Sequence, residues 1–90
     1  MPDLYDVAWT PTAQRDLAKL PEKVATAAVE FVYGGLSANP QRVGHELQRQ
    51  LAGLHSASRG DFRVLYGIDE PHRRVAIVAI DHRADIYRRR

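Results

Sequence analysis

The sequence predicts a single α+β domain in which a helical hairpin covers one face of a mostly antiparallel sheet, in the order β-α-α-β-β-β. Three observations predict this fold. Apolar residues recur at helical spacing in two stretches before residue 40, and they alternate as in strands before and after those stretches. A chain of 90 residues is also long enough for only one hydrophobic core. The domain therefore spans residues 1–90.

The first expected strand covers residues 5–9 and leads directly into a helix. Apolar side chains occupy every second position, Tyr5, Val7 and Trp9, which is typical of a strand with one buried face. Thr10 and Pro11 then indicate a helix start, because a hydroxyl can cap free N–H groups and proline is tolerated in the first turn.

The second expected helix follows Pro21, which ends the first one. Its apolar stripe consists of Val24, Ala28, Phe31 and Val32. Gly34-Gly35 is expected to loosen the end of this helix, and Asn39-Pro40 is a turn signal. The helical hairpin should therefore close before about residue 40.

The second half of the chain predicts three strands. Leu47, Leu51 and Leu54 lead through Gly53 into the first of these strands. Gly60-Asp61 forms the hairpin turn to the second strand, at residues 62–68. After a further turn, residues 75–80 are apolar on both faces. This last strand should lie inside the sheet and under the helices.

Composition excludes several classes of function. The chain has no cysteine, and its four histidines lie in separate elements without metal-ligand spacing. We therefore expect neither a metal nor a cofactor. No apolar run approaches the roughly 18 residues of a membrane span, and the start of the chain lacks a signal-peptide pattern. We expect a cytoplasmic protein without membrane contact.

Basic charge is concentrated in the second half. The net charge is +2, but residues 46–90 hold nine arginines and six acidic residues, and the last lysine is Lys23. Arginine suits bidentate binding of phosphate, although a GC-rich genome would also favour it. Arg49, Arg59, Arg88 and Arg89 are candidates for RNA contact. The closing Arg88-Arg89-Arg90 is equally typical of a solvated tail.

An arginine-centred cluster is the best candidate for chemistry. Alternation places Arg63 on the strand face opposite Phe62. An arginine within a strand of large apolar residues requires an explanation, because an unpaired buried guanidinium is costly. One explanation is a structural salt bridge, to Asp61, Asp69 or Asp81. The other is a site that Arg63 shares with the end of the next strand, where His82 and Arg83 precede Tyr87.

Such a cluster suits RNA cleavage without a metal. That reaction needs a base for the 2′-hydroxyl, positive charge around the phosphorus and a proton for the leaving oxygen. Arginines supply fixed charge. His82 could act as acid or base near neutrality, and Tyr87 could ionise beside cations or stack on a base.

Four segments resemble toxins of the RelE/ParE superfamily, in the family's order and over nearly the whole chain. They are Tyr5-x-Val7-x-Trp9-Thr10-x-x-Ala13-x-x-Asp16-Leu17-x-x-Leu20, Leu47-x-x-x-Leu51-x-Gly53, Arg59-Gly60-Asp61-Phe62-Arg63-Val64-x-Tyr66 and Ile80-x-His82-Arg83-x-x-x-Tyr87.

The resemblance implies the toxin of a type II toxin–antitoxin pair. RelE-like members enter the ribosomal A site and cut mRNA, leaving a 2′,3′-cyclic phosphate. It also implies that Arg63 holds the reacting phosphate, with His82, Arg83 and Tyr87 as its catalytic partners. A cognate antitoxin would bind the toxin as a heterodimer or heterotetramer, covering the helical hairpin and the sheet edge.

The chain departs from the family pattern at several positions, and the general base stays open. RelE has lysines on the strand before the glycine turn, whereas this chain has none there. YoeB-like relatives use a glutamate near the place of Glu46, which stands one residue late. Many relatives also have an arginine where this chain has Ser58, with Arg59 shifted by one. The candidates for the base are Glu46, His55 and Tyr87.

The missing lysines also fit an alternative function. ParE-like members of the superfamily bind and inhibit DNA gyrase and lack a full catalytic set. The sequence therefore predicts a ribosome-dependent mRNA endonuclease, with a gyrase-inhibiting toxin as the alternative.

Overall fold

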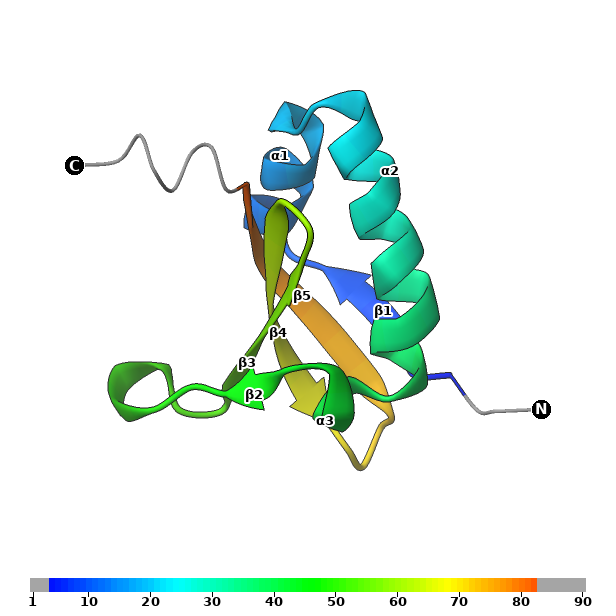
Figure 1. The fold of residues 1–90 in the computed structure, drawn as a ribbon. Coiled ribbons are helices and arrows are strands. Elements are labelled where there is room, and N and C mark those ends of the chain that lie inside the picture. Colours follow the sequence, from blue (N-terminus) through cyan, green and yellow to red (C-terminus); the bar gives the residue numbers. More distant parts are fainter. Residues whose placement is uncertain (1–3, 83–90) are drawn as a thin grey trace.

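A five-stranded sheet forms the centre of the molecule, in the order β1-β5-β4-β3-β2 (Figure 1). The computed structural model describes residues 4–82 of the chain. The strands are β1 (Asp6–Trp9), β2 (His45–Glu46), β3 (Leu54–Arg59), β4 (Phe62–Asp69) and β5 (Arg74–His82). β1 pairs with β5 in parallel, and the other neighbours are antiparallel. The predicted α+β class is confirmed.

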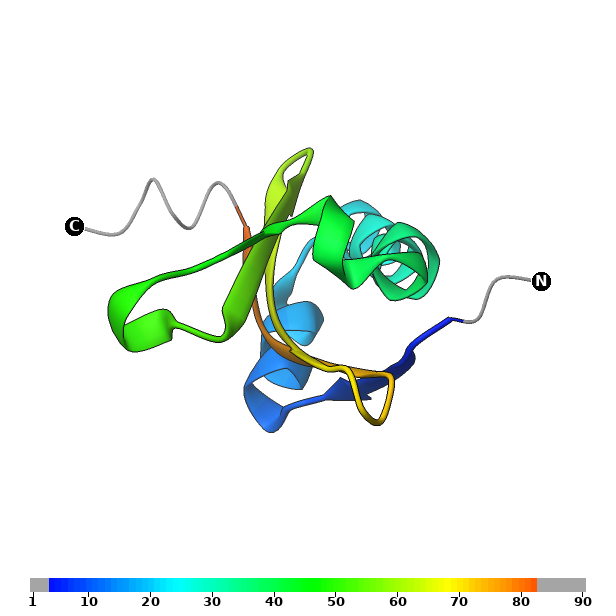
Figure 2. The same cartoon turned by 90° about the horizontal axis from the view of Figure 1, so that it is seen from below.

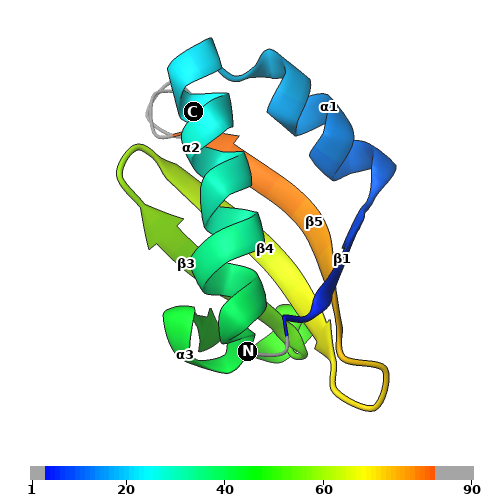
Figure 3. The same ribbon diagram turned by 90° about the vertical axis from the view of Figure 1, so that its right-hand side faces the viewer.

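The helices lie together on one face of this sheet, as Figure 3 shows. They are α1 (Pro11–Lys19), α2 (Glu22–Phe31) and the short α3 (Pro40–Val43). The predicted start of α1 is confirmed, because the Thr10 hydroxyl accepts a hydrogen bond from the Ala13 N–H at 3.1 Å. No helix within residues 4–82 is long and apolar enough to cross a membrane.

At Gly34-Gly35, where the sequence predicts a looser helix end, the regular α-helix gives way to a wider helical turn without breaking. The chain continues from α2 into a π-helical turn, η1 (Val32–Leu36), that contains both glycines. Val32 and Leu36 are fully buried, and a Cβ added at Gly35 would lie 3.6 Å from the ring of Phe31. Burial of these apolar side chains offsets the poor helix propensity of glycine, which costs about 1 kcal/mol per residue.

The hydrophobic core lies between the helices and the inner face of the sheet. We call the face that the helices cover the inner face and the opposite one the outer face. The core consists of Ala13, Ala28, Val32, Leu36, Ala57, Phe62, Val64, Tyr66, Val75, Ile77 and Ile80. Because successive strand residues point to opposite faces, the residues between the core positions of β4 belong to the outer face.

A bulge in β5 changes which of its residues face outward. Tyr66 pairs with Ile77, but Leu65 pairs with Ala79, so Val78 is an extra residue. Before the bulge, Val75 and Ile77 are buried, and after it the buried residue is Ile80. One inserted residue thus exchanges the two faces of the strand from Ala79 onward.

The segment between β2 and β3 projects from the body of the molecule (Figure 2). It contains a 3₁₀ turn, η2 (Arg49–Leu51), that the sequence did not predict. Arg49 adopts a φ of 60° and Gly53 a φ of 93°, both in the left-handed region. Gly53 suits this conformation because it has no side chain, and it returns the chain to β3 at Leu54.

Candidate functional site

A hollow on the outer face of the sheet contains Arg63. Its volume is about 280 Å³, and its lining consists of Leu47, Leu51, Ser56, Arg63, Leu65 and Asp81. We call it the outer hollow. None of its lining residues comes from an α-helix. The predicted direction of Arg63, away from the core, is confirmed by the burial of Phe62 and Val64 on either side of it.

Arg63 forms an ion pair with Asp81, one of the three acidic partners that the sequence offered. Arg63 Nη2 donates to Asp81 Oδ2 at 3.2 Å, and the two residues pair directly across β4 and β5. Their side chains are 45% and 33% exposed, so solvent reaches both. A guanidinium has several N–H donors, and this hydrogen bond uses one of its nitrogens.

His82 does not share the outer face with Arg63. The strands β4 and β5 are neighbours, but His82 pairs with Phe62, whose ring is in the core. The bulge explains this position. An unshifted register would place Ile80 and His82 on the outer face, whereas the observed one places Asp81 there. Arg83, Tyr87, Arg88 and Arg89 lie outside the described residues.

Glu46 and His55 also belong to the inner face. They pair with each other across β2 and β3, and His55 pairs on its other side with the buried Tyr66. The His55 ring stacks on that of Tyr66 with centroids 5.5 Å apart, and its buried Nδ1 has no hydrogen-bond partner among the described residues. Glu46 Oε2 accepts from the Gly53 N–H at 3.3 Å. Neither group faces Arg63.

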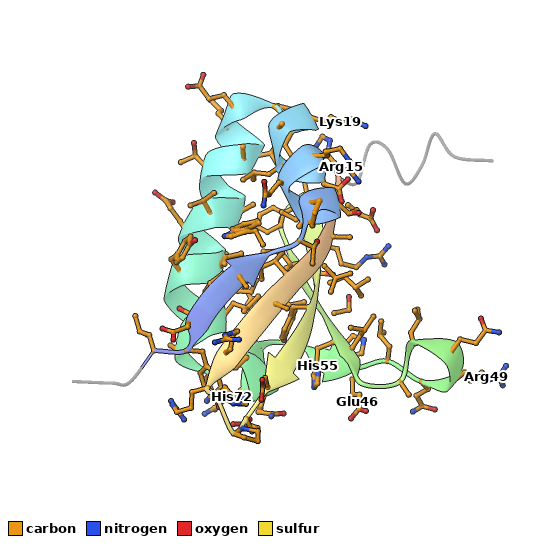
Figure 4. All side chains as sticks on the ribbon, turned by 180° about the vertical axis from the view of Figure 1, so that it is seen from behind. Arg15, Lys19, Glu46, Arg49, His55 and His72 are labelled. Atoms are coloured by element: carbon orange, nitrogen blue, oxygen red, sulfur yellow. The ribbon has the colours of Figure 1, made fainter. Side chains whose placement is uncertain are left out.

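The two described candidates for RNA contact lie in different elements, Arg49 in η2 and Arg59 at the end of β3. Arg49 is exposed in the projecting turn, beyond Glu46 and His55 in Figure 4. Arg59 lies on the inner face, where its guanidinium carbon is 4.6 Å from the centre of the Phe31 ring. There it lines a second hollow of about 550 Å³ between α2 and the β3–β4 turn. Arg49 shares the 3₁₀ turn η2 with Leu51, which lines the outer hollow.

The cap residue of α1, Thr10, and one residue within α1, Asp16, contact the backbone near the end of β5. The sequence did not predict this role. Asp16 Oδ2 accepts a hydrogen bond from the Ile80 N–H at 3.0 Å. The Thr10 hydroxyl lies within hydrogen-bond distance of the carbonyls of Ile77 and Val78, at 3.0 and 2.9 Å. Because β1 ends its pairing opposite Ile77, these side chains satisfy the strand edge beyond it. Both residues occur in the segment that resembles the family's opening.

The shifted pKa values lie outside the outer hollow. Hydrogen bonds from Tyr5 and Gln41 lower the pKa of Glu70, and the hydrogen bond to Glu70 raises the pKa of Tyr5. Burial raises the pKa of Tyr66. Within residues 4–82, no group of three histidine or acidic side chains is placed to hold a metal ion.

Comparisons with known proteins agree on one family. Residues 7–87 match the family model described as "ParE toxin of type II toxin-antitoxin system, parDE". The toxin RelG of Mycobacterium tuberculosis is 56% identical over 85 residues, covering 94% of this chain and 98% of the relative. The toxin RelE of the same organism is 57% identical over 84 residues, covering 93% and 87%.

Solved structures show the same fold. A chain of the RelBE2 toxin–antitoxin complex from M. tuberculosis superposes with a TM-score of 0.88 at 54% identity, covering 91% of this chain and 94% of that one. A chain of the intact E. coli RelBE complex gives a TM-score of 0.72 at 12% identity, covering 87% and 95%. The second likeness concerns the fold alone.

Proposed function

Since the chain belongs to the ParE toxin family of type II toxin–antitoxin systems, and so to the RelE/ParE superfamily, we propose that it is a RelE-like endonuclease that cleaves mRNA on the ribosome. The observation that carries this proposal is the exposed guanidinium of Arg63 in the outer hollow. The high identity to toxins named RelE and RelG favours the RelE-like function within the superfamily.

The outer hollow offers the guanidinium of Arg63 to a phosphate of an RNA strand. Cleavage through the 2′-hydroxyl builds negative charge on the phosphate oxygens, and a preorganised guanidinium stabilises that charge. The lining leucines make part of the hollow apolar, while the side chains of Arg63 and Asp81 stay accessible to solvent. In this proposal Arg63 binds the scissile phosphate, and the products carry a 2′,3′-cyclic phosphate and a 5′-hydroxyl.

We also propose that the chain binds a cognate antitoxin. The homologous chain of the RelBE2 structure was solved as a toxin–antitoxin complex, with 54% sequence identity to this one. A heterodimer or heterotetramer of this kind would hold the toxin inactive until the antitoxin is lost.

The test is cleavage of a translated mRNA by purified protein, with mRNA ends mapped by primer extension. We expect cuts within codons only when ribosomes are present. Arg63→Ala should reduce the cleavage rate by about a hundredfold or more, because it removes a preorganised charge from the transition state. Its unfolding midpoint should stay close to that of the wild type, since a half-exposed ion pair is worth only about 0–1 kcal/mol.

Lys23→Ala is the matched control. It removes a cation from α2, on the helical side of the molecule, and should leave cleavage unchanged. Full activity of Arg63→Ala would remove Arg63 from the site.

The alternative is a gyrase-binding toxin. The description of the matched family model names ParE, and the described strands lack the lysines that RelE has. A gyrase supercoiling assay run beside the cleavage assay separates the two functions. Inhibited supercoiling together with intact mRNA would contradict the nuclease proposal.

A further inference from the structure

The outer hollow contains one carboxylate among the described residues, and it belongs to Asp81. Glu46 and His55, the other described candidates for a proton acceptor, lie on the inner face. A base that serves a phosphate bound by Arg63 must lie on the same face as Arg63. Asp81 meets this condition, because it pairs with Arg63 directly across β4 and β5.

We propose that Asp81 is the general base, which takes the proton of the 2′-hydroxyl that attacks the phosphate held by Arg63. This inference rests on the proposed mRNA cleavage. It assigns a catalytic role to a residue that the sequence offered only as a salt-bridge partner.

The short distance between the two groups suits RNA geometry. In RNA the 2′-oxygen is on the ribose carbon next to the one that carries the scissile phosphate, so the base and the phosphate-binding group must be neighbours. Asp81 Oδ2 lies 3.2 Å from Arg63 Nη2. The remaining guanidinium N–H groups can bind phosphate oxygens while the carboxylate accepts a hydrogen bond from the hydroxyl.

Stability alone does not account for the ion pair. Both side chains are exposed by a third or more, and such pairs contribute about 0–1 kcal/mol. A carboxylate beside a phosphate site also repels the substrate, which weakens binding. A role in the reaction would explain why a negatively charged residue, Asp81, stands beside the phosphate-binding Arg63.

The backbone around Asp81 is held firmly. The preceding residue, Ile80, is buried, and its N–H donates to Asp16 of α1. The bulge at Val78 sets the register that turns Asp81 outward, and Thr10 contacts the carbonyl groups at the bulge. Position matters for a base, since proton transfer requires heavy atoms within about 2.6–3.2 Å.

The step balances without a co-reactant. Asp81 takes the proton of the 2′-hydroxyl, the 2′-oxygen forms a bond to phosphorus, and the bond from phosphorus to the 5′-oxygen breaks. The 5′-oxygen takes a proton from water, and the hydroxide that remains takes the proton from Asp81. The enzyme returns to its starting state, and the RNA ends as a 2′,3′-cyclic phosphate and a 5′-hydroxyl.

The experiment compares Asp81→Asn and Asp81→Ala with the wild type in single-turnover cleavage of mRNA on ribosomes. The rate at saturating toxin should fall by about a hundredfold or more in both variants, which is the usual contribution of a positioned base. The half-saturating toxin concentration should stay the same or decrease, because repulsion of the phosphate is lost. Added formate should partly restore the rate of Asp81→Ala, in which the carboxylate's space is empty, and should not affect the wild type.

Asp69→Asn is the matched control. It changes an exposed hydrogen-bonded contact, between Asp69 Oδ2 and His72 Nδ1 at 2.9 Å, at the other end of β4 and β5. Its saturated rate should equal that of the wild type. Thermal unfolding of all variants checks that each is folded.

Three outcomes would overturn the proposal. A saturated rate of Asp81→Asn within about threefold of the wild type would show that no base was lost, since the expected loss is about a hundredfold or more. A rate above the wild type would make Asp81 a restraining counter-ion of Arg63 instead. A wild-type protein that cuts no mRNA would overturn the proposed function itself, and the role of Asp81 with it.

Discussion

Tyr66 joins the sheet to the segment that follows the helical hairpin. It is fully buried on β4, and its hydroxyl donates to the carbonyl of Pro40 at 2.7 Å. Its ring stacks on His55. A Cβ at Gly44 would come within 2.6 Å of the hydroxyl, so the backbone there can approach only because residue 44 is glycine. One side chain thereby fixes α3 against β3 and β4.

Tyr66→Phe should therefore destabilise the fold without changing its shape. The variant leaves the buried Pro40 carbonyl without its partner, which costs about 1–3 kcal/mol. Chemical denaturation at neutral pH should show this as a lower free energy of unfolding with an unchanged m-value. An unchanged midpoint would mean that water replaces the hydroxyl at Pro40.

The same variant should change how stability depends on alkaline pH. Burial raises the pKa of Tyr66 above its usual 10.0, so the folded protein favours the neutral phenol. Its contribution is fully present below pH 10 and is lost as the pH rises through the folded pKa. The gap in stability between wild type and Tyr66→Phe should narrow above pH 10, as unfolding curves at several pH values would show.

At the scale of elements, α1 supports the outer hollow from the opposite face of the sheet. Its cap Thr10 and its residue Asp16 satisfy backbone groups of β5 on both sides of the bulge. The bulge in turn decides that Asp81, rather than His82, lies on the outer face. A helix that contributes no residue to the hollow therefore determines which side chains enter it.

Asp16→Ala should cost about 1–3 kcal/mol of unfolding free energy, because it leaves the partly buried Ile80 N–H without an acceptor. Asp16→Asn retains a carbonyl oxygen in the same place and should recover much of that loss. Cleavage by Asp16→Ala should fall as well, since the neighbouring Asp81 loses its support. Equal stability and activity in all three proteins would show that β5 holds its register unaided.

More of the fold than of the candidate site could be predicted from the sequence. Alternation around Arg63 predicted its face, because large apolar residues flank it on β4. The sequence offered three acidic partners for Arg63, Asp81 among them, but could not choose between them, since the run of β5 is apolar on both faces and does not specify a register. The same ambiguity led to the expectation that His82 would join Arg63. β2 has only two residues and makes no pattern of its own.

For the molecule as a whole, the sheet separates the hydrophobic core on one side from the proposed site on the other. The helices and the core occupy the inner face, while the outer face carries Arg63, Asp81 and the projecting turn with Arg49. Nucleic acid that approached the outer face would meet neither α1 nor α2, which lie on the other side of the sheet. Affinity for a ribosome carrying mRNA should then depend on the cations of this side.

Binding should accordingly weaken with salt in a way that a variant can report. The probe is a ribosome loaded with an mRNA that lacks 2′-hydroxyls at the A-site codon, which cannot be cut by the proposed reaction. The slope of log affinity against log salt should fall by about 1 in Arg63→Ala, because one phosphate contact is lost. Lys23→Ala should keep the wild-type slope. A slope unaffected by Arg63→Ala would place the bound phosphate elsewhere.

The parallel pairing of β1 with β5 has a consequence for how this toxin comes into being. Asp6 pairs with Arg74, so β1 is synthesised first but cannot pair until β5 has been synthesised. At about 5–20 residues per second of synthesis, that delay is roughly 3–14 s. Contacts so distant in sequence also slow folding after synthesis. The sheet that carries the proposed site is therefore complete only after synthesis has passed β5.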